Sequence, residues 1–226
     1  MERIGAAVIG LGGMGLGDVG TLQKRGAEYV HTVKGFDISP DARRRAQEMR
    51  DIEVYDDIRE LWADPAIQVV YICTSNASHV PLSIDALKAG KAVMCEKPFG
   101  CTREETQALA RTVHETDGWF QGGFECRNYS RLYQEIKDII DSGEIGELRH
   151  MQHTYVLQPW SNASSWRRSM KESGGLFCEK LCHYVDLPRW WDGTPIEEFF
   201  IAKASNILPG EFEPIDNCEL TYRFRS

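Results

Sequence analysis

The sequence of 226 residues lacks the features that mark membrane or nucleic-acid-binding proteins. No window approaches the roughly 18 continuous apolar residues of a membrane-spanning helix. Lys and Arg number 26 against 34 Asp and Glu, and the resulting net charge of −8 argues against nucleic acid or an anionic membrane as a partner, because both need clustered cations. The first residues show no basic region followed by an apolar segment and a cleavage site, so we expect no secretion signal and a cytoplasmic location.

Paired-cysteine patterns are also missing. The seven cysteines are scattered and none forms a C-x-x-C pair, which is typical of thiols in a reducing cytoplasm and unlike a disulfide framework. One crowded group, Cys178, Glu179, Cys182 and His183, invites a metal interpretation. On a helix its members form two pairs on different faces, and one ion could reach only one pair, so we predict no metal site.

The first half of the chain alternates short apolar runs with helical stretches. Continuous hydrophobicity, as in residues 69–73, is typical of strands buried on both faces of a parallel sheet. Helix boundaries are readable between the runs, for example the capping box of Thr102 and Glu105. The pattern predicts an α/β fold with a doubly wound parallel sheet, a Rossmann domain, over residues 1–123. The expected strands are Ile4–Ile9, Val30–Phe36, Glu53–Tyr55, Ile67–Cys73, Ala92–Cys95 and Trp119–Gly122.

After Gly123 the pattern becomes that of an α+β domain, residues 124–226. Two or three strands with one long helix make a poor independent core, so we expect this second domain to be incomplete. Pro188 should kink or end the long helix near Leu187, because proline lacks a backbone donor. The expected elements are a helix with one apolar face that ends at Ser142-Gly143, an alternating stretch over Leu148–Leu157, a helix near 174–191, and strands over Phe199–Ile207 and Cys218–Phe224.

A glycine-rich loop, Gly10-Leu-Gly12-Gly13-Met14-Gly15, follows the first strand and opens a helix. Gly10 permits a tight turn, Gly12 lets backbone N–H groups approach a pyrophosphate, and Gly15 allows close packing of helix on strand. The positive end of the helix dipole adds to the attraction for phosphate. We therefore expect all four glycines and Met14 to border a bound dinucleotide.

Asp37 lies 22 residues beyond Gly15, at the end of the second strand. A carboxylate there accepts hydrogen bonds from the ribose hydroxyls of NAD and repels the 2′-phosphate of NADP, so NAD is predicted over NADP. The arginines at 43–45 keep NADP open as the alternative. A second alternative is that Asp37 merely caps the helix that begins near Pro40.

Two further motifs follow strands, at the sheet edge where a doubly wound fold places its chemistry. They are Thr74-Ser75-Asn76-Ala-Ser-His79 and Cys95-Glu96-Lys97-Pro98. With the glycine loop they resemble the Gfo/Idh/MocA family of sugar and polyol dehydrogenases, which carries a Gly-rich loop, a T-P-N-x-x-H-like turn and an E-K-P motif in this order. The resemblance continues through residues 123–127, 142–146, 166–167 and 174–186, and so covers essentially the whole chain.

This resemblance implies a site for hydride transfer to a nicotinamide. Lys97 would hydrogen-bond the reacting oxygen and stabilise the charge that develops on it, and Pro98 would fix the backbone, for instance through a cis bond. The residues expected to border the cofactor here are Thr74, Ser75, Asn76, His79, Glu96 and Lys97.

Glu179, His183 and Asp186 are spaced i, i+4 and i+7, on one face of an otherwise apolar helix, and such a polar stripe should line a cleft. Oxidation of a secondary alcohol needs a base for the hydroxyl proton, and an imidazole with an unperturbed pKa of ~6.5 suits that task. We therefore predict His183 as the base, Glu179 as a contact to a neighbouring substrate hydroxyl, and Asp186 as structural. Arg127, Trp166 and Arg167 are the remaining candidates for the substrate pocket, with surface or packing roles as the alternative.

Together these features predict an NAD(P)-dependent dehydrogenase that acts on a secondary hydroxyl of a sugar, inositol or related polyol. By the same resemblance the complete protein is expected to be a homo-oligomer. Three alternatives stay open: a redox-assisted lyase or glycosidase with bound NAD, a non-catalytic dinucleotide-binding regulator, and a truncated inactive product. The presence of both Lys97 and His183 argues against the regulator, which needs no acid/base pair.

Overall fold

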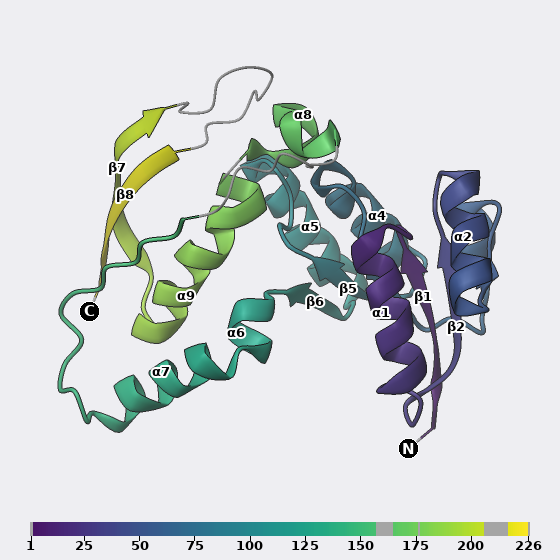
Figure 1. The fold of residues 1–226 in the computed structure, drawn as a ribbon, viewed down its shortest axis with the longest axis horizontal. Coiled ribbons are helices and arrows are strands. Elements are labelled where there is room, and N and C mark those ends of the chain that lie inside the picture. Colours follow the sequence, from purple (N-terminus) through teal and green to yellow (C-terminus); the bar gives the residue numbers. More distant parts are fainter. Residues whose placement is uncertain (1, 157–164, 176, 206–216, 226) are drawn as a thin grey trace. The chain divides into compact units, whose positions relative to one another are not determined.

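The computed structural model describes residues 2–156, 165–175, 177–205 and 217–225. Two compact units make up the chain: unit 1, Met1–Gly123, and unit 2, Phe124–Ser226 (Figure 1). Among the described residues, no helix is long and apolar enough to span a membrane.

Unit 1 contains a single sheet with the strand order β3-β2-β1-β4-β5-β6, in which every neighbouring pair is parallel. This confirms the predicted doubly wound α/β fold. The order reverses between β1 and β4, which is the position where such sheets bind ligands at the carboxyl ends of their strands. The strands are β1 (Ile4–Ile9), β2 (Val30–Phe36), β3 (Glu53–Val54), β4 (Val69–Ile72), β5 (Ala92–Glu96) and β6 (Phe120–Gly123).

Helices cover both faces of this sheet. Because side chains alternate along a strand, Ala6 and Val8 of β1 pack in one cluster with the first two helices, and Ala7 and Ile9 pack in another with the next three. All four residues are at most 1% exposed, which explains why these strands read as continuous apolar runs. The helices are α1 (Gly13–Lys24), α2 (Pro40–Arg50), α3 (Ile58–Ala63), α4 (Asn76–Lys88) and α5 (Arg103–Thr116).

Unit 2 combines helices with an antiparallel strand pair, as an α+β domain does. The strands β7 (Ile196–Ser205) and β8 (Asn217–Phe224) pair with each other. The helical elements are α6 (Glu125–Tyr129), α7 (Arg131–Ser142), the 3₁₀ segment η1 (Ser165–Arg168), α8 (Met170–Ser173), the π-helical segment η2 (Phe177–Leu181) and α9 (Cys182–Asp192).

The helix expected near 174–191 is built differently. A π-helical segment precedes α9, and Pro188 lies inside α9, which continues to Asp192, so the expected end near Leu187 is wrong. Proline removes the donor for the carbonyl of Tyr184, four residues earlier. That carbonyl instead accepts a hydrogen bond from the hydroxyl of Tyr222 on β8, at 3.3 Å. A replacement donor therefore lets the helix pass through the proline.

The alternating stretch of residues 148–157 does not form a strand over its described part, 148–156, and residue 157 lies outside the described residues. A strand needs a hydrogen-bonded partner, and within the described chain β7 and β8 pair only with each other. The apolar face of α7 is also less buried than its pattern predicts. This face lines a groove of about 530 Å³ together with Ile145, Leu148, Met151, Gln152, His153, Pro188 and Trp191.

A polar cluster stabilises unit 1 at the end of α3. The Asp64 carboxylate accepts hydrogen bonds from the Tyr55 hydroxyl at 2.6 Å, from the Ala66 backbone at 2.8 Å and from Lys34 Nζ at 3.1 Å. Lys91 Nζ donates to the Asp64 carbonyl at 2.7 Å. The three donors to the carboxylate, the Tyr55 hydroxyl first, hold the pKa of the Asp64 carboxyl at about 2.

Asp64→Asn should lower the free energy of unfolding by about 1–3 kcal/mol, because it removes a charge that three donors share. The folded-state pKa lies below the ordinary value, so this stabilisation is present above about pH 4 and is lost as the pH falls toward 2. Urea denaturation should therefore show the gap between wild type and variant closing over that range. Asp41→Asn, which breaks an exposed pair with Arg44, is the control, and equal loss in both variants would contradict the assignment.

Candidate functional site

The glycine loop connects β1 to α1 at the edge where the strand order reverses. Gly10 has a φ of +91°, and a Cβ there would lie 2.7 Å from the carbonyl oxygen of Cys73. A Cβ on Gly15 would lie 1.9 Å from the Gly10 carbonyl oxygen, so α1 can approach β1 this closely only with glycine. Gly12 and Gly13 have nothing within 4 Å of an added Cβ, and in the described chain no side chain caps α1. Its first N–H groups therefore suit a bound pyrophosphate.

Two backbone N–H groups fix the Asp37 carboxylate beside this loop. Leu11 donates to Oδ2 and Ser39 to Oδ1, both at 2.8 Å. A carboxylate oxygen accepts more than one hydrogen bond, so the group can still receive the ribose hydroxyls. The cap of α2 is Ser39, whose hydroxyl accepts from the Ala42 N–H. The alternative that Asp37 merely caps that helix is wrong.

The three arginines that kept NADP open each bind a group of the protein. Two of them donate to backbone carbonyls, one in the glycine loop and one on the residue that follows β2. A 2′-phosphate would have to compete with these carbonyls for the arginine N–H groups. This arrangement favours NAD. Arg43 donates to the Asp37 carbonyl at 2.7 Å, Arg44 to the Asp41 carboxylate at 2.8 Å and Arg45 to the Leu11 carbonyl at 3.2 Å.

The motifs after β4 and β5 are joined by His79. Its buried ring places Nδ1 2.9 Å from the Pro98 carbonyl oxygen and Nε2 3.2 Å from the Thr74 carbonyl oxygen. Asn76, at the start of α4, is equally buried. The peptide bond between Lys97 and Pro98 is cis, as expected. His79 thus holds the two motifs together, and its direct contact with a cofactor stays a prediction.

Other residues expected around the cofactor lie at the end of β5, at the start of α4 and in the first turn of α1. Glu96 ends β5, and its Oε2 accepts the backbone N–H of Lys97 at 3.3 Å. The hydroxyl of Ser75 lies 3.2 Å from that of Ser78. Met14 is exposed in the first turn of α1. Their roles toward the cofactor are predictions.

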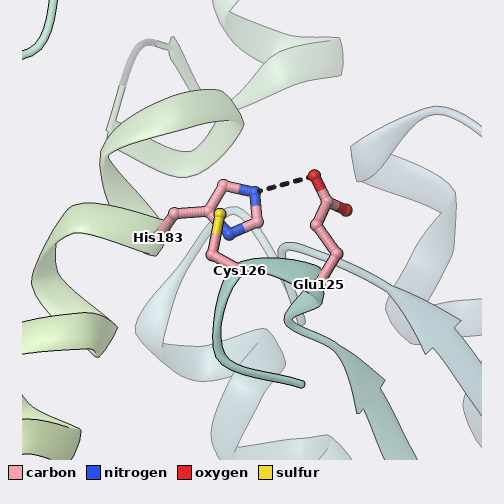
Figure 2. A group of neighbouring side chains, drawn as sticks. All are labelled: Glu125, Cys126 and His183. Carbon is pink, nitrogen blue, oxygen red and sulfur yellow. Dashed lines mark ion pairs between the residues drawn. The ribbon is translucent and has the colours of Figure 1, made fainter. Parts of the chain in front are cut away.

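In unit 2, His183 is only 3% exposed. Its Nε2 lies 3.8 Å from Glu125 Oε1, and the two groups together with the Cys126 thiol bring three potential ligand atoms within 4.8 Å of one another. Figure 2 shows the carboxylate of α6 directed at the imidazole of α9, with the sulfur beside the ring. The ring of Phe124 packs edge-on against the imidazole, with centroids 5.9 Å apart. The sequence did not predict this cluster, because Cys126 and His183 are 57 positions apart.

Glu179 is 2% exposed and lies in the π-helical segment η2, so the regular α-helical spacing assumed for it and His183 does not hold. Such π-turns are frequent at functional sites. Its carboxylate accepts a hydrogen bond from Arg167 Nε at 3.0 Å, and the Arg167 guanidinium lies 4.6 Å from the centroid of the Trp166 ring. Arg167 therefore compensates the buried charge, and a contact between Glu179 or Trp166 and a substrate stays a prediction.

Asp186 binds two arginines of unit 2. Its Oδ1 lies 3.4 Å from Arg127 Nη1 and 3.3 Å from Arg189 Nη2. The Arg127 guanidinium also lies 5.7 Å from the centroid of the Phe124 ring. These contacts fit the structural role expected for Asp186. Arg127 uses one of its donors on this carboxylate, and its contact with a substrate stays a prediction.

Both parts of the chain match profiles of one protein family. Residues 4–124 match the profile described as "Oxidoreductase family, NAD-binding Rossmann fold", and residues 133–226 match the "GFO/IDH/MocA C-terminal domain". The first match confirms the predicted dinucleotide-binding fold and NAD as its cofactor.

Similarity to individual proteins supports the same family assignment. The chain is 27% identical to myo-inositol 2-dehydrogenase of Thermotoga maritima over 223 residues, covering 96% of this chain and 65% of that protein. It is 31% identical to inositol 2-dehydrogenase of Salmonella typhimurium over 208 residues, covering 88% and 59%. An oxidoreductase domain protein from Kribbella flavida superposes with a TM-score of 0.87 at 25% identity, covering 100% and 65%. The chain thus spans about three-fifths to two-thirds of the length of these relatives.

Asp37→Asn should weaken NAD binding by about tenfold or more and narrow the preference for NAD over NADP. The amide offers one acceptor in place of two and no charge to repel a 2′-phosphate, and a hydrogen bond to a charged group contributes about 1.5–3 kcal/mol. Isothermal titration with each dinucleotide measures both affinities. Asp41→Asn is again the control, because this carboxylate near the start of α2 forms an exposed pair with Arg44. Unchanged affinities in Asp37→Asn would remove the residue from the ribose site.

Proposed function

The chain belongs to the Gfo/Idh/MocA oxidoreductase family, and from this premise we propose that the protein is an NAD-dependent dehydrogenase. It oxidises, or in reverse forms, a secondary hydroxyl of an inositol or a related polyol or sugar. The observation that carries the proposal is the buried imidazole of His183 with the Glu125 carboxylate 3.8 Å away. A base in such a setting suits the removal of a hydroxyl proton.

Bound NAD would supply the hydride acceptor, at C4 of its nicotinamide. The glycine loop would hold the pyrophosphate at the start of α1, and Asp37 would hold the adenosine ribose. Two N–H donors already orient this carboxylate, so little reorganisation is needed when the dinucleotide binds.

The remaining roles concern the substrate hydroxyl. His183 would take its proton, and the nearby Glu125 carboxylate would stabilise the imidazolium that results. Lys97 would donate a hydrogen bond to the same oxygen as its charge develops. Glu179, held by Arg167 at 3.0 Å, would bind a neighbouring hydroxyl, which is a feature that polyols share and simple alcohols lack.

The substrate class rests on the relatives. Those from Thermotoga maritima and Salmonella typhimurium are named as inositol 2-dehydrogenases, and one from Bacillus subtilis, 30% identical, is named scyllo-inositol 2-dehydrogenase (NAD(+)). Inositols present several adjacent secondary hydroxyls. His183 would act on one of them, and the Glu179 carboxylate would orient the ring through a neighbouring one. Location in the cytoplasm and assembly into a homo-oligomer are part of the proposal, the first supported by the seven thiols.

A panel of inositols, sugars and sugar acids, monitored by NADH absorbance, tests the proposed activity. We expect NADH formation with at least one inositol and little with a simple secondary alcohol. Conversion of a glycoside without net NADH would favour redox-assisted elimination instead. Tight NAD binding with no turnover of any polyol would contradict the proposal.

His183→Gln should reduce the turnover rate by about 10²–10⁴-fold, the usual contribution of general acid–base catalysis, and leave NAD affinity nearly unchanged. Steady-state kinetics together with NAD titration separate the two quantities. His114→Gln, an exposed position near the end of α5, is the matched control and should retain turnover. A His183→Gln variant with wild-type turnover would remove this residue from the role of base.

A further inference from the structure

We propose that Glu125, Cys126 and His183 form a binding site for a divalent metal ion of the zinc type, and that an ion bound there inhibits the enzyme. The inhibitory part rests on the proposed function, because it requires His183 to be the base. The binding part rests only on the cluster in unit 2.

The donor set suits zinc. It joins a carboxylate, a thiolate and an imidazole, the three side-chain types that zinc binds in proteins. When the ion displaces the thiol proton of Cys126, the two anionic ligands balance the charge of the ion, and one proton is released to solvent. A neutral assembly is what a half-buried position tolerates best.

The distances are close to those required. In a tetrahedral zinc site with metal–ligand bonds of about 2.0–2.3 Å, ligand atoms lie roughly 3.3–3.6 Å apart. In this cluster the carboxylate and imidazole atoms are 3.8 Å apart, and all three ligand atoms lie within 4.8 Å of one another. The separations therefore have to shrink by up to about 1.3 Å, and the exposed Glu125 side chain can supply part of this change. Water would take the fourth position.

The surroundings also favour a bound ion. Phe124 and Tyr184 lie edge-on to the imidazole, with ring centroids 5.9 and 6.4 Å away, and place aromatic rings beside this ligand. The cation of the same helix, Arg127, lies 3.4 Å from the Asp186 carboxylate. That ion pair offsets a positive charge that would otherwise oppose the metal.

The cluster differs from the one that the sequence suggested and rejected. The division of Cys178, Glu179, Cys182 and His183 into two pairs assumed one regular helix, whereas Cys178 and Glu179 lie in the π-helical segment η2, and Glu179 is bound to Arg167. The folded chain instead brings α6 to the His183 side of α9, so that two adjacent residues and one distant residue meet (Figure 2). The prediction of no metal site considered only ligands close together in sequence.

An ion on the imidazole would prevent it from accepting a proton. Metal binding and the proposed proton transfer therefore exclude each other, and zinc should act as an inhibitor that a chelator reverses.

Titration of the chelator-treated protein with Co²⁺ tests the site without any need for activity. Tetrahedral cobalt with one thiolate ligand has intense visible bands and a charge-transfer band in the near ultraviolet. We expect these bands to saturate at one ion per chain. Cys126→Ser should abolish the charge-transfer band and weaken binding by more than the roughly 10–100-fold that loss of an outer-shell partner costs. His183→Gln should also weaken binding.

Cys182→Ser is the matched control, because this half-buried thiol adjoins His183 and lies outside the cluster. It should keep the spectrum. Absence of the bands in the wild type, or their loss in Cys182→Ser and survival in Cys126→Ser, would overturn the site.

Measurements of the turnover rate with and without zinc test the proposed inhibition. Zinc should slow the wild type and spare Cys126→Ser, and a chelator should restore the wild type. Cobalt binding without inhibition by zinc would overturn the regulatory assignment and leave the site. Cobalt binding by a protein that turns over no polyol would leave the site intact and instead refute the proposed function.

Discussion

The parallel pairing of β1 between β2 and β4 is the constraint on which the arrangement of unit 1 depends. Parallel strands all end at the same edge of a sheet. The segments that follow these strands and β5 are therefore brought together there: the glycine loop, Asp37, residues 74–79, and Lys97 with its cis proline. Hydrogen bonds between these segments, from Leu11 to Asp37 and between His79 and the motif after β5, then fix their positions. The chemistry of this edge follows from the sheet and its connections.

Sequence patterns were sufficient to predict this unit because its signals are local. Buried parallel strands give continuous apolar runs, and each strand is followed by a short motif whose residue types already indicate its chemistry. The sequence could not show which groups these side chains hydrogen-bond. The engagement of the arginines at 43–45 and the anchoring of Asp37 became visible only when residues distant in sequence were placed beside each other.

Prediction was weaker in unit 2, for physical reasons. The spacing of Glu179 and His183 assumed one regular helix, whereas a π-helical segment precedes α9. Pro188 was expected to kink or end the helix, but α9 continues past it, and a hydroxyl from β8 satisfies the carbonyl that the proline leaves without its helical donor. The group around His183 joins residues more than fifty positions apart. The last two features depend on tertiary contacts, which leave no local signal in the sequence.

The most direct test of the central claim follows the hydride itself. The polyol that turns over best, deuterated at the carbon that bears the oxidised hydroxyl, is incubated with NAD, and the NADH formed is examined by proton NMR at C4 of the nicotinamide. Direct transfer between substrate and cofactor predicts that one C4 position carries the deuterium. NADH without deuterium at C4 would contradict the account.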